Sequence, residues 1–200
     1  EHYFEAKKSL FTPAHSRCGV VCIDDEWGLR LAQESEVPVT TVSVFSHREA
    51  DWTVRRINFD RAIPAVTFDL VTPQGDERLI RMPMLGEVNV QNAVVALVAA
   101  LKLGCEFEAA VSALEGAEQI PGRMTSVNPD PGAQPLVIVD FAHTPEGLDW
   151  TLKSVRELTR GKLVLVFGTD GDRDATKREP LAEIAAQLAD VLWVTDENPR

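Results

Sequence analysis

The sequence predicts an α/β protein built in two parts, and two patterns support this fold class. Between residues 136 and 196, runs that are apolar throughout alternate with helical segments; the runs are LVIVD (136–140), KLVLVFG (162–168) and VLWVTD (191–196). This alternation is typical of a parallel sheet with helices on both faces. Before residue 120, β-rich runs follow one another and lead into apolar helices. The second part therefore predicts the beginning of a doubly wound α/β domain.

The first part contains most of the predicted strands. Asp24 and Asp25 stand where the N-cap of a helix over 26–35 belongs. The stretch 73–76 (PQGD) separates two strands and predicts a hairpin. A strongly apolar helix over 89–104 ends at Gly104. The remaining expected elements are a short amphipathic helix within 1–11, strands at 18–23, 39–45, 52–59, 65–72 and 77–85, and a helix at 107–117.

The domain boundary is predicted in the connector PGRMTSVNPDPGAQP, residues 121–135. This stretch contains four prolines and two glycines, which is the composition of a turn-rich linker. We therefore expect domains at 1–122 and 123–200. Two helices, at 144–159 and 177–190, separate the strands of the second domain.

Composition and charge exclude several classes of protein. The formal net charge of −11 over 200 residues argues against general affinity for nucleic acid, because phosphate backbones need an excess of cations. No apolar run reaches the roughly 18 residues of a membrane span, and the charged start EHYFEAKKSLF does not have the pattern of a signal peptide. Three cysteines, Cys18, Cys22 and Cys105, lack metal-like spacing, so we expect them to be reduced and buried in a cytoplasmic protein.

Polar residues follow all three predicted strands of the second part. They lie at the carboxyl ends of the strands, which is where parallel sheets bind their ligands. Asp140 could accept hydrogen bonds from a ribose diol, and His143 could donate to a phosphate. Solvated loops with helix caps are the alternative, and Thr144 before Pro145 does predict a cap. The three polar stretches are DFAH (140–143), GTDGDRD (168–174) and DENPR (196–200).

Further candidates lie outside these strand ends. Asn89 and Asn92, three residues apart on one helix, are helix caps or contacts to the edge of a base. Arg123 follows Pro-Gly in the linker and is a phosphate contact or a surface cation. The stretch 168–178 (GTDGDRDATKR) indicates a small acid or phosphate nearby. It has neither the GxGxxG nor the GxxxxGK[ST] spacing, and the latter is absent from the whole chain.

Taken together, six segments resemble, in the same order, the motifs of the Mur ligase family, most closely its tripeptide-forming members. The segments are EHYFEAKKSLF, GEVNVQNAVVAL, IPGRM, DFAHTPEGL, FGTDGDRDATKR and TDENPR. The resemblance covers almost the whole chain. It implies the second half of a central ATPase domain followed by the first half of a Rossmann-like C-terminal ligase domain. We therefore expect a fragment without the UDP-sugar domain and the phosphate loop, inactive by itself.

The resemblance also implies a reaction. With Mg²⁺ as cofactor, ATP would drive amide formation between UDP-MurNAc-L-Ala-D-Glu and a diamino acid through an acyl phosphate. The diamino acid that the resemblance favours is meso-2,6-diaminopimelate. The protein would be monomeric and cytoplasmic, without membrane or nucleic-acid partners. By its position in the matching motifs, Lys7 would be carbamylated and bind Mg²⁺, and Asn92, with support from Asn89, would contact adenine. The contacts to phosphate and ribose would be Arg123, Asp140 and His143. The distal carboxylate of the amino acid would be held by Arg173, Asn198 and Arg200.

The sequence departs from the family pattern at a few positions. Phe141 stands where Tyr is usual, and Glu197 replaces Asp before NPR. Asp170 adds a negative charge beside the amino-acid site, which would favour a cation there, so lysine and ornithine remain open as substrates. The same motifs also leave open another Mur-type ligase, such as a folylpolyglutamate synthetase, and a non-catalytic binding module.

Overall fold

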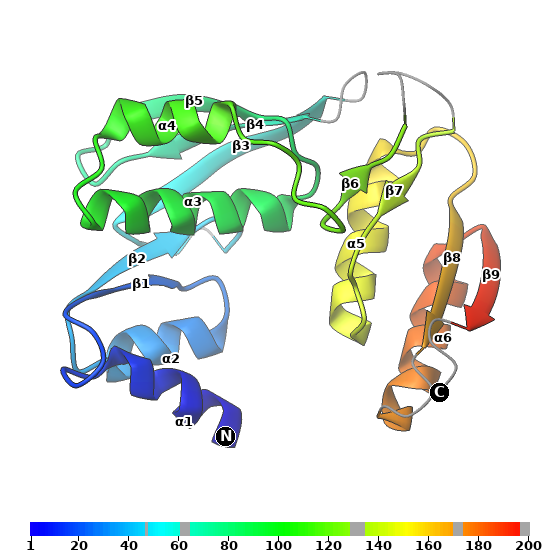
Figure 1. The fold of residues 1–200 in the computed structure, drawn as a ribbon, viewed down its shortest axis with the longest axis horizontal. Coiled ribbons are helices and arrows are strands. Elements are labelled where there is room, and N and C mark those ends of the chain that lie inside the picture. The colour runs from blue at the N-terminus through cyan, green and yellow to red at the C-terminus, as the bar shows by residue number, and fades with distance from the viewer. Residues whose placement is uncertain (47, 61–64, 129–134, 170–173, 197–200) are drawn as a thin grey trace. The chain divides into compact units, whose positions relative to one another are not determined.

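The structure is a computed structural model that describes the chain except residues 47, 61–64, 129–134, 170–173 and 197–200. It contains two compact units, Glu1–Glu118 and Gln119–Arg200 (Figure 1). Each unit mixes helices and strands, which confirms the predicted α/β class. The domain boundary between residues 122 and 123 remains a prediction, and the two units are described separately.

The first unit is built on a five-stranded sheet in the order β1-β2-β3-β4-β5 (Figure 1). Strands β1, β2 and β3 are parallel, and β3, β4 and β5 are antiparallel. The predicted hairpin joins β4 to β5, and Gly75 adopts φ +87° in its turn, a conformation that favours glycine. The strands are β1 (Gly19–Cys22), β2 (Val39–Ser43), β3 (Trp52–Asp60), β4 (Ala65–Val71) and β5 (Glu77–Met82).

Helices α3 (Glu87–Lys102) and α4 (Phe107–Glu115) form one hydrophobic core with this sheet. Strand β4 is buried along almost its whole length, and Phe68 and Leu70 have no exposed surface. Side chains from β2, β3 and β5 complete the core. This core fixes α3, and with it the two asparagines that the sequence singled out.

The N-terminal helices of the first unit follow local signals in the sequence. Helix α1 (His2–Lys8) continues into the 3-10 turn η1 (Ser9–Phe11). Helix α2 (Glu26–Glu34) begins at its N-cap Asp25, whose carboxylate accepts from the Gly28 N–H at 2.6 Å. The predicted cap is thus confirmed at Asp25, whereas Asp24 has a different role, described below.

The second unit differs in detail from the predicted three-stranded parallel sheet. Strands β8 (Val164–Thr169) and β9 (Val191–Asp196) are parallel as predicted. The predicted strand at 136–140 is reduced to β7 (Ile138–Val139), which pairs antiparallel with β6 (Thr125–Ser126). The reason is local: the connector runs back along β7, so Val127 N–H donates to Val137 O at 3.0 Å. Among the described residues, β7 is not paired with β8.

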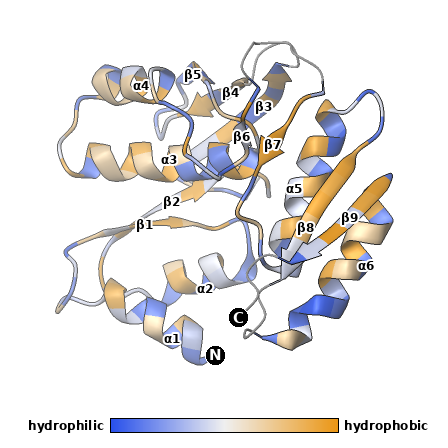
Figure 2. Ribbon diagram, turned by 45° about the vertical axis from the view of Figure 1, so that its right-hand side comes forward, coloured by the Kyte–Doolittle hydropathy of each residue, from blue (hydrophilic) through white to orange (hydrophobic). Residues whose placement is uncertain are grey.

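Two helices cover one face of the β8–β9 pair. Helices α5 (Pro145–Leu158) and α6 (Arg178–Leu188), the latter preceded by η2 (Ala175–Lys177), pack Leu148, Leu152 and Leu181 against the strands. Figure 2 shows both strands as strongly hydrophobic, yet Val166 is 65% exposed and Trp193 is 66% exposed. The sequence had predicted helices on both faces of the sheet. Within the described residues, helices cover only one face of this pair.

Two further expectations can be checked against the fold. The cysteines are free, but Cys18 and Cys105 are exposed and Cys22 is half-buried, so the prediction that all three are buried was wrong. Their local sequences carry no signal for burial, because Cys18 precedes β1 and Cys105 follows the end of α3. None of the helices in the described part of the chain has the length and hydropathy needed to cross a membrane.

Candidate functional site

A cation, an aromatic ring and an imidazole stack on the surface of the second unit. The Arg123 guanidinium lies 5.0 Å from the centre of the Phe141 ring, and the Phe141 and His143 rings meet edge to face at 5.0 Å. All three side chains are exposed. Arg123 forms no ion pair with any residue that the structure describes, so its guanidinium is available to an anion.

Asp140 organises the backbone around this stack. Its carboxylate accepts from Met124 N–H, Ala142 N–H and the Thr151 hydroxyl, each at 2.9 Å. Met124 adopts φ +50°, which is uncommon outside glycine, and this conformation turns its N–H toward Asp140. A carboxylate has about four acceptor positions, and three are occupied. Asp140 thus ties the connector to α5, with capacity left for one further donor.

The tautomer of His143 follows from its neighbour. Nδ1 lies 3.0 Å from the Phe141 carbonyl oxygen, which can only accept, so Nδ1 carries a proton. In the neutral ring Nε2 is then an unprotonated acceptor, and in the cationic ring it is a second donor. Through these contacts the structure places Arg123, Asp140 and His143 in one cluster. These are the three residues predicted to contact phosphate and ribose.

The two asparagines of α3 differ sharply in exposure. Asn89 is 6% exposed, and its side-chain amide donates to Leu85 O at 2.6 Å. Asn92 is exposed, one turn further along the helix. The N-cap is Gly86, at φ 90°, so the interpretation of the asparagines as caps was wrong. Asn89 holds the beginning of the helix, and Asn92 is the one of the pair that a ligand can reach.

Sequence reasoning missed a hydrogen-bonded hub at Asp24. The Asp24 carboxylate accepts from the backbone N–H groups of Val44, Phe45 and Ser46 at 3.0–3.1 Å. It also accepts from the Gln91 amide of α3 at 3.1 Å and from the Cys22 thiol at 3.2 Å. The hub therefore connects the ends of β1 and β2 to the front of α3, next to Asn92.

The electrostatics of the hub are consistent with these bonds. Burial by itself would raise the pKa of Asp24, but the hydrogen bonds, led by that from Ser46 N–H, lower the pKa to about 2. Burial raises the pKa of the Cys22 thiol to about 11, which keeps it protonated and able to donate. The available signal in the sequence was the second acid of the Asp24-Asp25 pair, since a cap needs only one.

Lys7 lies on α1 and is exposed. Its Nζ is 5.4 Å from the centre of the Tyr3 ring, and it forms no ion pair within the described part of the chain. No three His, Cys, Asp or Glu side chains among the described residues lie close enough together to hold a metal ion. The structure thus places Lys7 apart from any ready-made cluster of metal ligands.

The three predicted amino-acid contacts, Arg173, Asn198 and Arg200, lie outside the described residues, as do Asp170 and Glu197. The strands that precede them are described. Strand β8 is paired in parallel with β9 up to Thr169 and Asp196, so the two strands end at the same edge of the pair.

Comparisons with known proteins match this chain along its length. Residues 1–100 match the Mur ligase middle domain, and residues 122–200 match the domain described as "Mur ligase, glutamate ligase domain". A Streptomyces coelicolor protein named UDP-N-acetylmuramoyl-L-alanyl-D-glutamate–2,6-diaminopimelate ligase is 40% identical over 200 residues, which are 100% of this chain and 39% of that protein. A Leifsonia xyli protein named UDP-N-acetylmuramyl-tripeptide synthetase is 42% identical over 99% of this chain and 38% of its own length.

Solved structures agree with these matches. A structure of a UDP-N-acetylmuramoyl-L-alanyl-D-glutamate–2,6-diaminopimelate ligase superposes with a TM-score of 0.65 at 32% identity, covering 99% of this chain and 40% of that one. A UDP-N-acetylmuramate-alanine ligase from Thermotoga maritima, 22% identical, shares the fold at a TM-score of 0.74 over 97% of this chain and 40% of its own. The chain thus spans about two fifths of the length of these relatives. It belongs to the Mur ligase family and comprises parts of the family's middle and C-terminal domains.

Proposed function

We propose that the full-length protein is an ATP-dependent ligase of peptidoglycan precursor synthesis. It joins meso-2,6-diaminopimelate to UDP-MurNAc-L-Ala-D-Glu in the cytoplasm, as a monomer, without nucleic-acid or membrane partners. The observation that carries this proposal is the 40% identity, over the whole chain, to a relative named for that reaction. The segments GDRD and ENPR support diaminopimelate, because the arginines and the amide of Arg173, Arg200 and Asn198 can pair with its distal carboxylate.

The reaction proceeds in two steps. A carboxylate oxygen of the D-glutamyl residue attacks the γ-phosphorus of ATP, which releases ADP and leaves an acyl phosphate. The amine of the diamino acid then attacks the acyl carbon, and phosphate departs with the former carboxylate oxygen. Cations are required in the first step, because an anion approaches a polyanion.

The surface stack in the second unit provides one of these cations. Arg123 has no carboxylate partner among the described residues, and it lies over Phe141 with His143 beside the same ring. We assign Arg123 and His143 to phosphate and Asp140 to the ribose. Asn92 reads the adenine edge, while the buried Asn89 supports it by fixing the beginning of α3.

Lys7 is the residue of this chain that would contribute to Mg²⁺ binding. As a carbamate it would offer oxygen ligands, which Mg²⁺ prefers and an ammonium cannot provide. Its side chain is exposed and has no carboxylate partner among the described residues, which leaves the amine accessible to carbon dioxide. No group of three His, Cys, Asp or Glu side chains that could hold a metal ion occurs in the described part of the chain, and within that part we assign Lys7 alone as a metal ligand. Bound Mg²⁺ would neutralise phosphate charge.

The amino acid has one serious alternative. Asp170, beside the proposed contacts, adds negative charge and favours a substrate that ends in a cation, such as lysine or ornithine. The 200-residue chain alone, which contains no GxxxxGK[ST] phosphate loop, is proposed to be inactive.

An isotope experiment tests the proposed reaction. The full-length protein is given ATP, Mg²⁺, meso-diaminopimelate and UDP-dipeptide labelled with ¹⁸O in the D-glutamyl γ-carboxylate. We expect one equivalent each of UDP-tripeptide, ADP and phosphate, with one ¹⁸O atom in each phosphate. Tripeptide without label in the phosphate would overturn the acyl-phosphate step. The absence of any tripeptide, with L-lysine and L-ornithine as well as with meso-diaminopimelate, would overturn the ligase assignment.

A further inference from the structure

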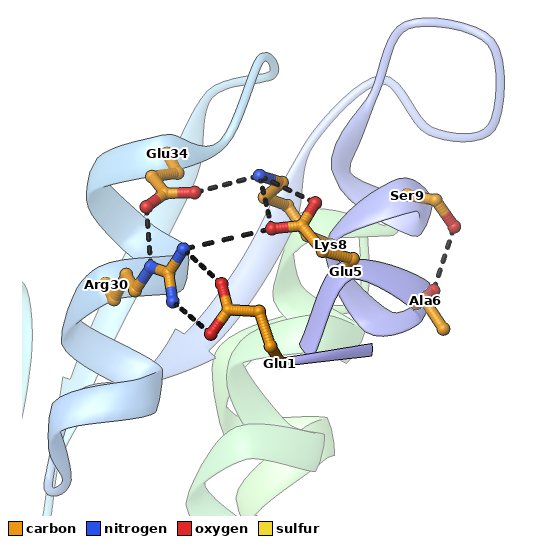
Figure 3. Close-up of polar contacts among 7 residues, drawn as sticks. All are labelled: Glu1, Glu5, Ala6, Lys8, Ser9, Arg30 and Glu34. Atoms are coloured by element: carbon orange, nitrogen blue, oxygen red, sulfur yellow. Dashed lines mark hydrogen bonds and ion pairs between the residues drawn. The ribbon is translucent and has the colours of Figure 1, made fainter. Parts of the chain in front are cut away.

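A network of ion pairs fastens α1 to α2 (Figure 3). Arg30 of α2 donates to both carboxylate oxygens of Glu1, from Nη2 at 2.9 Å and from Nη1 at 3.2 Å. Arg30 Nε also donates to Glu34 at 2.6 Å. Lys8 closes the network, because its Nζ lies 2.9 Å from Glu34 and 3.0 Å from Glu5. Isolated surface ion pairs contribute little, but a bidentate arginine within a network of several charges holds a defined geometry.

The same arginine covers an aromatic contact. Its guanidinium lies 4.2 Å from the centre of the Phe4 ring, and Phe4 lies 5.4 Å from Trp27 of α2. Phe4 is the buried residue of α1. The α1–α2 interface therefore combines an aromatic contact with a set of ion pairs, and Arg30 contacts both.

Helical geometry then places the two lysines of α1 differently. At about 100° per residue, one face of α1 carries Glu1, Phe4, Glu5 and Lys8. Each of these four residues contacts a side chain of α2. Lys7 falls on another face with Tyr3, one turn earlier, and its Nζ lies over that ring. The network thus determines the rotation of α1 about its axis, and with it the direction of Lys7.

The network also separates the two lysines chemically. Lys8 Nζ donates to Glu34 at 2.9 Å and to Glu5 at 3.1 Å, so two carboxylates hold it on the side of α1 that faces α2. Carbamate formation needs a neutral amine: its lone pair forms the N–C bond to carbon dioxide, one C=O π pair moves to oxygen, and the nitrogen releases a proton to water. Lys8 is thus engaged by two carboxylates, whereas Lys7 has no carboxylate partner among the described residues.

We propose that Arg30 is a positioning residue for Lys7, acting through the Glu1–Glu5–Lys8–Glu34 network to present Lys7, and not Lys8, for carbamylation and metal binding. This inference rests on the proposed role of Lys7. In this proposal Arg30 is not a ligand of substrate or metal; it sets the orientation of the helix that carries the metal ligand.

The test uses the full-length protein with Arg30→Met and compares it with Arg55→Met. The control removes another exposed ion pair of the first unit, the 2.7 Å contact between Arg55 and Glu77. Protein equilibrated with ¹³C-bicarbonate is examined by ¹³C NMR for a carbamate signal that Lys7→Ala abolishes. In Arg30→Met we expect that signal to fall several-fold and kcat about tenfold, with KM for the UDP-dipeptide within twofold of wild type. Arg55→Met should match wild type in all three.

The outcomes separate the two proposals. A wild-type protein without a Lys7 carbamate signal would overturn the role of Lys7, and the positioning inference with it. A normal wild-type signal that persists undiminished in Arg30→Met would overturn the inference alone. If Arg30→Met does not fold, Glu34→Gln removes the carboxylate shared by Arg30 and Lys8 and should lower the same signal. An unchanged signal in a folded Glu34→Gln protein would contradict the inference.

Discussion

The hydrogen-bonded hub at Asp24 gives the sharpest prediction about stability. Asp24→Asn keeps the shape of the side chain, but it removes the charge from an acceptor of three backbone N–H groups, those of Val44, Phe45 and Ser46. It also replaces the oxygen that accepts from Gln91 with an NH₂ group, which sets donor against donor. We therefore expect the loop after β2 and the front of α3 to loosen together.

The magnitude follows from the bonds themselves. A hydrogen bond to a charged group contributes about 1 kcal/mol more than a neutral one. Three such bonds share Asp24, they are not additive, and part of the carboxylate is open to water. A loss of about 2–3 kcal/mol in the free energy of unfolding of the first unit results. The neighbouring Asp25→Asn is the matched control, because Asn and Asp cap helices about equally well and the cost should stay near 0.5 kcal/mol.

The loss also has a defined pH dependence. The pKa of Asp24 is about 2 in the folded protein and about 3.9 in an unfolded chain. Ionised Asp24 therefore stabilises the fold fully above about pH 4, and this contribution disappears as the pH falls toward 2. The difference between wild type and Asp24→Asn should narrow over that window.

Urea denaturation followed by circular dichroism measures the loss, and hydrogen exchange locates it. The Val44, Phe45 and Ser46 amides should exchange faster in Asp24→Asn than in Asp25→Asn. If the two variants are equally stable at pH 7 and those amides remain equally protected, the hub does not hold the strand ends and the reasoning fails.

Three other substitutions, two of them paired with a control substitution, test separate features. Gly28→Ala should destabilise α2 by about 1–3 kcal/mol in thermal melts, because its Cβ would lie 1.9 Å from the Cys22 carbonyl oxygen, whereas Gly161→Ala meets open space and should be neutral; equal melting temperatures would contradict this. Thr144→Ala removes the N-cap of α5 and should cost about 1 kcal/mol, a loss that Thr144→Ser should largely avoid. In the full-length protein, Arg123→Met should raise KM for ATP about tenfold through loss of a charge-assisted phosphate contact, and an unchanged KM would remove Arg123 from the nucleotide site.

Local patterns in the sequence predicted much of the fold. The caps at Asp25 and Thr144 and the hairpin turn at Gly75 are each specified within a few residues, and all three were confirmed. The parallel pairing of β8 with β9 followed from apolar runs separated by a helix. These features need no information from distant parts of the chain.

Features that depend on distant contacts could not be predicted in the same way. The donors to Asp24 lie some 20 and 67 residues away, so its sequence neighbours indicate only a cap. The burial of Asn89 depends on the core beneath α3, and the spacing to Asn92 carries no trace of it. The short β7 pairs with the connector through a register that its apolar sequence does not encode. The roles of Lys7, Arg123, Asp140 and His143 remain predictions from family motifs.

A competition between two amino acids tests the central claim most directly. The full-length protein is offered equal concentrations of meso-diaminopimelate and L-lysine with ATP and UDP-MurNAc-L-Ala-D-Glu, and the UDP-tripeptides are resolved by mass. A paired carboxylate contributes on the order of 2–3 kcal/mol, so diaminopimelate product should exceed lysine product by about 30-fold or more. Arg200→Ala should abolish most of that preference. Predominance of the lysine product would contradict the proposed specificity and place Asp170, rather than Arg200, in control of the choice.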